Sequence, residues 1–82
     1  MARYFFDLIN GDGAVRDDQG QEMSTREGVT REVSRILADL AREELPDREN
    51  GAISIKVRDE QGHAVLTGRL SFQTQWHDEP EN

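Results

Sequence analysis

Carboxylates gather near the N-terminus of this chain, at the turns that follow its first apolar segment. The five acidic residues there are Asp7, Asp12, Asp17, Asp18 and Glu22. Such oxygens could hold a calcium ion, but their spacing does not follow the ligand order of an EF-hand loop. Aspartate and glycine are also the residues that tight turns need for their own geometry. The sequence therefore favours turn chemistry over a cation site, and it predicts neither a metal nor a cofactor.

Other residue types capable of chemistry also lack the partners that a reaction needs. His63 and His77 have no ligand partner at the spacing of a zinc site. The serines lie in no nucleophile elbow, and the chain has no cysteine. We also expect no two acidic residues to be buried together as a general acid and base. The sequence therefore predicts no catalytic residue and a protein that is not an enzyme.

Charge narrows the classes of partner. The chain has 82 residues and a formal net charge of −7. Such a surface repels phosphate backbones and anionic membranes, which disfavours nucleic acid and a membrane as partners. A protein partner fits the charge better, although solubility is the simplest interpretation of it. A chain this short buries only roughly 60% of its unfolded surface, so we expect no large substrate cavity.

The sequence also bears on location. No apolar run reaches the roughly 18 residues that a membrane span needs. Asp7 follows too soon after Met1 for a signal peptide. We therefore predict a cytoplasmic protein.

Two hairpins are predicted to flank one helix. Alternating apolar residues bounded by glycine-containing turns are typical of hairpin strands. The predicted strands are residues 3–9, 14–16, 52–58 and 64–75.

The helix is predicted to begin at a capping box made by Ser24 and Glu27, with Met23 as the hydrophobic residue outside it. It is expected to end before Pro46, because the residue preceding a proline avoids the helical region. The apolar positions recur at helical spacing as one stripe. They are Val29, Val33, Ile36, Leu37, Leu40 and Ala41.

These elements predict an α+β fold of order β-β-α-β-β. One amphipathic helix would pack on a four-stranded, mainly antiparallel sheet, whose other face can stay in contact with water. Residues 1–76 are expected to form a single α+β domain, and residues 77–82 a disordered acidic tail.

Several motifs, taken in order, resemble those of a known family. They are Tyr4-Phe5-Phe6-Asp7, Asp12-Gly13, Asp17-Asp18-Gln19-Gly20-Gln21-Glu22 and Val57-Arg58-Asp59-Glu60-Gln61-Gly62. The family is a domain of unknown function in short proteins of rhizobia and related alphaproteobacteria, with a Tyr-Phe-Phe-Asp/His signature at its N-terminus. The resemblance covers roughly residues 3–72. It implies no activity, cofactor or catalytic residue.

Three apolar residues, Phe5, Ile9 and Val65, fall on the side of their strands that faces away from the predicted helix. Clustered exposed apolar groups often mark an association surface. We expect these residues to form an interaction surface for a protein partner or for a second copy in a homodimer, through the sheet face or a strand edge. A small apolar patch on a monomer is the alternative.

The leading function is therefore a non-enzymatic protein-interaction or accessory, regulatory module. An antitoxin-like or nucleic-acid-associated regulator is the first alternative, and it would need a basic face. A small-ligand binder or enzyme is the second alternative, and it would need a deep pocket with converging titratable groups.

Overall fold

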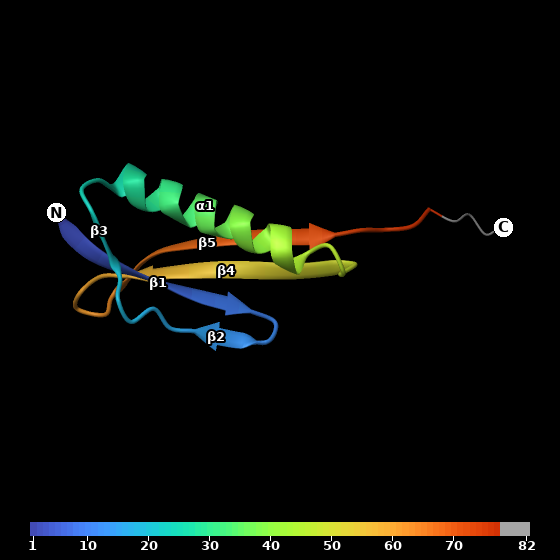
Figure 1. Ribbon diagram of the computed structural model, residues 1–82, viewed down its shortest axis with the longest axis horizontal. Coiled ribbons are helices and arrows are strands. Elements are labelled where there is room, and N and C mark those ends of the chain that lie inside the picture. Colours follow the sequence, from blue (N-terminus) through green and yellow to red (C-terminus); the bar gives the residue numbers. More distant parts are fainter. Residues whose placement is uncertain (78–82) are drawn as a thin grey trace.

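The structure is a computed structural model that describes residues 1–77. Within these residues, one helix lies across one face of an antiparallel sheet (Figure 1). The elements are β1 (Ala2–Asn10), β2 (Gly13–Val15), β3 (Gln21–Met23), α1 (Arg26–Glu44), β4 (Asn50–Arg58) and β5 (Ala64–Gln73). The predicted α+β class, with one helix on an antiparallel sheet, is confirmed.

The sheet formed by residues 1–77 has five strands, one more than the four predicted. The strand order is β2-β1-β4-β5, and β3 pairs with the start of β1, where Arg3 lies opposite Glu22. β2 pairs with the other end of β1, where Ile9 lies opposite Ala14. The additional strand, β3, is only three residues long, which is too short to show the alternation that identifies a strand in a sequence.

The helix begins one residue later than predicted. Thr25 is the N-cap: its backbone is extended, and its Oγ1 accepts a hydrogen bond from the Gly28 N–H at 2.9 Å. The predicted capping box of Ser24 and Glu27 is therefore wrong. The C-terminal end agrees with the prediction, since α1 ends at Glu44 and the Leu45 N–H donates to the Ala41 carbonyl.

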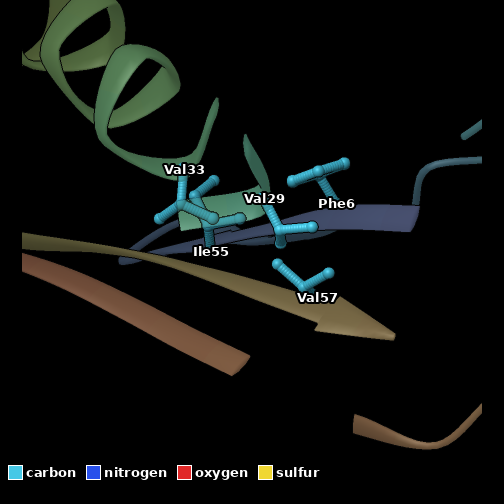
Figure 2. Packing of buried hydrophobic residues seen from close by; sticks show 5 residues of the cluster. All are labelled: Phe6, Val29, Val33, Ile55 and Val57. Atoms are coloured by element: carbon cyan, nitrogen blue, oxygen red, sulfur yellow. The ribbon is translucent and has the colours of Figure 1, made fainter. Parts of the chain in front are cut away.

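The core lies between α1 and the middle of the sheet (Figure 2). Val29 and Val33 point down from the helix toward Phe6 of β1 and toward Ile55 and Val57 of β4. The partly buried residues around this cluster are Tyr4, Leu8, Met23, Ile36, Leu37, Leu40 and Leu66. The inward faces predicted for β1, β4 and the helix therefore meet as expected.

β5 comes closest to the helix at Gly68. A Cβ atom built on Gly68 would collide with Val33 Cγ1 and would lie 3.4 Å from Leu37 Cδ1. The absence of a side chain here lets helix side chains pack directly against the strand.

The C-terminal strand ends at Gln73, earlier than the predicted Gln75. The Thr74 N–H still donates to the Glu49 carbonyl at 2.8 Å, which continues the pairing with the start of β4. Trp76 follows with 81% of its surface exposed. Of the predicted tail at residues 77–82, residues 78–82 lie outside the described part of the chain.

Candidate functional site

Asp17 holds the loop between β2 and β3 against β1. Its carboxylate accepts hydrogen bonds from three backbone N–H groups, those of Phe6 at 3.0 Å, Gln19 at 3.1 Å and Gly20 at 3.1 Å. Burial raises the pKa of Asp17, but these hydrogen bonds outweigh it and leave the pKa below its ordinary value of 3.8. Asp17 is therefore an ionised structural group, in agreement with turn chemistry.

Asp7 lies next to Asp17 and forms an ion pair with Arg58 on the sheet face opposite α1. Arg58 Nε is 2.8 Å from Asp7 Oδ2, and the two side chains are only 13% and 15% exposed, respectively. The Asp17 N–H donates to Asp7 Oδ1 at 2.9 Å. Burial raises the pKa of Asp7, but the hydrogen bonds from Arg58 and Asp17 and the charge of Arg58 lower it below 3.8 overall.

Arg58 joins three parts of the chain. Besides Asp7, its Nη2 donates to the Asp17 carbonyl at 2.8 Å, and its Cζ lies 4.7 Å from the centre of the Phe5 ring. The hydrogen bond to Asp7 raises the pKa of Arg58, so its charge is permanent. Asp7 and Asp17 lie next to each other but are only half-buried, and both carboxylates accept hydrogen bonds from backbone N–H groups. The cluster therefore ties the loop between β2 and β3, and the end of β4, to β1.

Sequence reasoning missed this cluster because its members are far apart in the chain. Asp7 and Arg58 are separated by 51 positions. Both residues occupy outward positions on predicted strands, so the sequence does indicate that they share one face of the sheet. The register that places Phe5 opposite Arg58, and so brings the guanidinium diagonally to Asp7, depends on how the strands pair.

The three residues predicted as an interaction surface lie in different surroundings. Phe5 is half-buried beneath the Arg58 guanidinium, and its Cε2 would be 2.9 Å from a Cβ placed on Gly20. Ile9 and Val65 are each 40% exposed. Ile9 lies on β1 near the β2 hairpin, whereas Val65 lies two strands away at the start of β5. Strand spacing and rise separate them by about 15 Å, so the structure does not bring the three together as one patch.

Val65 borders a cleft. It has no partner in the β4–β5 ladder, because the register shifts between Val57 and Arg58 and forms a bulge. The cleft has a volume of about 420 Å³ and lies between the N-terminal half of α1 and the start of β5. Its lining residues are Tyr4, Arg26, Val29, Thr30, Val65 and Leu66. Arg26 forms no ion pair with any residue from 1 to 77, so a charged guanidinium stands beside a mainly apolar hollow.

The same strand forms an edge of the sheet. In the described chain, β4 is the only neighbour of β5. The Thr74 N–H points to β4, so the alternation of an antiparallel ladder directs every second backbone group outward. The residues with outward N–H and C=O groups are Thr67, Arg69, Ser71 and Gln73. β5 contains no proline and has Arg69 as its only charged residue, although natural edge strands are usually protected by such residues.

Two kinds of site are absent from the part of the chain that is described. No group of three or more histidine, aspartate or glutamate side chains within residues 1–77 could hold a metal ion. No helix among these residues is long and apolar enough to cross a membrane. The candidate functional site is the free edge of β5 together with the cleft next to it.

Comparison with known families covers most of these features. The family model described as Domain of unknown function (DUF6894) matches residues 3–71. The chain belongs to this family. The matched DUF6894 range includes the Asp7–Asp17–Arg58 cluster and most of β5, but its description assigns no function to them. Neither a curated protein nor a solved structure matches the chain.

Proposed function

We propose that this DUF6894 protein is a non-enzymatic protein-interaction module that binds an extended protein segment along the free edge of β5. The observation that carries the proposal is a ten-residue edge strand, open on one side in the described chain, that begins beside an apolar cleft. In binding by strand addition, backbone hydrogen bonds provide affinity and pockets for alternate side chains provide specificity. In this protein the open edge of β5 and the apolar cleft lie next to each other.

The side chains of β5 also support this proposal. Leu66, Leu70 and Phe72 point toward the helix side of the sheet but remain only half-buried. An added strand would cover more of their apolar surface, at about 25 cal/mol for each Å² removed from water. Val65, one of the three residues predicted as an interaction surface, lies at the beginning of this edge.

Nucleic-acid association is less well supported. Lys56 and Arg69 are exposed on the open face of the sheet and form no ion pair with described residues. Two phosphate contacts would give a salt dependence with a slope of only about −2, far below that of a typical DNA-binding protein. The net charge of −7 further opposes such a partner.

We also propose that the protein is cytoplasmic and that it comes from the alphaproteobacteria whose family members share its N-terminal motif. A chain without cysteine needs no disulfide and is suited to a reducing compartment. Fractionation of the native cells followed by immunodetection tests the location.

The edge is tested by capturing the tagged protein from its own cells. Ser71→Pro removes an outward N–H group and places a ring on the free edge, without affecting a hydrogen bond to β4. Ser71→Ala is the matched control, because it keeps the backbone N–H. We expect proteins captured by wild type and by Ser71→Ala to be lost with Ser71→Pro, while circular dichroism shows that all three are folded. Equal capture by the three proteins would contradict the proposal.

A further inference from the structure

We infer that the segment bound at the β5 edge is β5 of a second copy of this chain, paired antiparallel about Ser71, with Trp76 of each copy seated in the cleft of the other. This inference rests on the proposed function, because it needs the edge of β5 to be a binding site. It adds the identity of the partner, the register and the residue that fills the cleft.

Backbone geometry restricts the register. Hydrogen bonds across a new antiparallel interface require residues whose N–H and C=O groups already point outward. In a pairing about Ser71, this residue faces its own counterpart, and Arg69 faces Gln73 of the second copy. All of these positions belong to the outward-directed set of β5, as established by the Thr74 hydrogen bond to β4. The sheet would therefore continue across the interface without a change in either copy.

The same register aligns the apolar side chains on the helix side. Leu70 then lies opposite Phe72 of the second copy, and Leu66 lies opposite Trp76 of the second copy. Aromatic and aliphatic pairs of this kind stabilise neighbouring strands. Trp76 continues the alternation of β5 three residues beyond its end and is 81% exposed in the isolated chain, so it is available for such a contact.

The cleft offers suitable surroundings for the indole. Leu66 lines the cleft together with Tyr4, Val29 and Arg26, so a side chain opposite Leu66 arrives at its mouth. The volume of about 420 Å³ accommodates a tryptophan side chain. Arg26 supplies a guanidinium that can lie over the indole face, and Tyr4 supplies an aromatic neighbour.

Charge favours this register over its neighbours. A pairing about Arg69 would place two guanidinium groups directly opposite each other, which is destabilising. A pairing about Ser71 separates the two Arg69 side chains by about 14 Å along the strands, which exceeds the Debye length of about 8 Å at physiological salt. β5 itself carries no carboxylate that could lie opposite another carboxylate in this pairing. In a pairing about Leu70, Trp76 of one copy would lie opposite Ala64 of the other copy. It would then no longer lie opposite Leu66, which lines the cleft.

The first experiment uses Trp76 as the probe, because it is the only tryptophan in the chain. We expect light scattering of the purified wild type at high micromolar concentration to give a dimer with blue-shifted tryptophan emission. Dilution should shift the emission to the red as the dimer dissociates. Trp76→Ala should raise the dissociation constant of the dimer by about tenfold or more. Ser71→Pro should abolish the dimer, and Ser71→Ala should preserve it.

The second experiment tests the register with single cysteines, which is possible because the chain has none of its own. In Ser71→Cys the two thiols would belong to directly opposed residues, whose Cα separation of about 5.5 Å permits a disulfide. Arg69→Cys is the matched control, since its thiols would be about 14 Å apart. Under mild oxidation we expect covalent dimers of Ser71→Cys and far fewer of Arg69→Cys.

The outcomes separate this inference from the proposed function. A monomeric wild type, or equal crosslinking of the two cysteine variants, overturns the pairing about Ser71. If the wild type is monomeric and Ser71→Pro still loses the proteins captured from cells, the edge remains a binding site and only the second copy is wrong. A dimer that survives both Ser71→Pro and Trp76→Ala overturns the pairing through β5, and equal capture of cellular proteins by wild type and Ser71→Pro then overturns the edge as a binding site.

Discussion

Arg58 reaches Asp7 across the β1–β4 pairing, with Nε 2.8 Å from Oδ2, although 51 positions of the chain separate them. This ion pair is one of the links between the opening segment and the second hairpin. Its guanidinium also covers Phe5 and binds the Asp17 carbonyl.

The first prediction concerns Arg58→Gln. The substitution leaves the Asp7 carboxylate largely buried without its cation, so we expect the melting temperature to fall by several degrees. Asp7→Asn combined with Arg58→Gln should destabilise less than the sum of the two single changes, because the pair acts as a unit. Thermal unfolding followed by circular dichroism checks both. Arg69→Gln, on the same face of the sheet, is the control and should stay close to wild type; additive effects would disprove the coupling.

The second prediction concerns pH. Because the pKa values of Asp7 and Asp17 are lowered in the folded state, their stabilisation is complete above the ordinary value of 3.8 and is lost as pH falls through the folded values. Urea unfolding should therefore show Asp17→Asn well below wild type at pH 7, with the difference shrinking below pH 3.8. Asp18→Asn is the control from the same loop. A difference for Asp17→Asn that does not change with pH would contradict the prediction.

The third prediction concerns the start of the helix. Thr25→Ala removes the acceptor for the Gly28 N–H, so the free energy of unfolding should fall by about 1 kcal/mol. Ser24→Ala should change it by less than about 0.5 kcal/mol, since its hydroxyl does not cap the helix. Chemical denaturation of the two variants distinguishes the caps. A larger loss of stability from Ser24→Ala than from Thr25→Ala would identify Ser24 as the N-cap.

The fourth prediction concerns the contact between β5 and the helix. Gly68→Ala places a methyl group against Val33, so it should destabilise the protein by about 1–3 kcal/mol. In a Val33→Ala background the same change should cost much less, because the added methyl fills the space that valine vacates. Gly11→Ala is the control, since a Cβ there meets no atom within 4 Å. Equal destabilisation in both backgrounds would show that the effect of Gly68→Ala does not come from its contact with Val33.

The elements that the sequence predicted well are those with a sustained period. Ile53, Ile55 and Val57 alternate over a full strand, and all three are buried. Gly62 has the positive φ expected of the second hairpin turn, at +89°. The third strand and the N-cap were missed for a local reason: a three-residue segment has no period, and Ser24 and Thr25 are adjacent residues of similar capping ability.

The candidate site was less accessible to sequence reasoning. That Phe5, Ile9 and Val65 have no place in the helix-side core follows from alternation, but what covers each residue depends on distant parts of the chain. Phe5 is covered by Arg58, whose approach depends on strand register. Val65 borders the cleft because a bulge interrupts the alternation at that point. The sequence allows contact through a strand edge, but only the strand order identifies β5 as the strand that provides this edge.

The hydrogen bond from Arg58 to the Asp17 carbonyl has a consequence for the order of folding. The loop that Asp17 organises is encoded early in the chain, yet this contact becomes available only when residue 58 has paired with β1. Contacts between residues this far apart in the chain are slow to form, because closing the intervening loop costs conformational entropy. During synthesis, the loop between β2 and β3 therefore gains its hydrogen bond from Arg58 only after the chain has been made as far as residue 58.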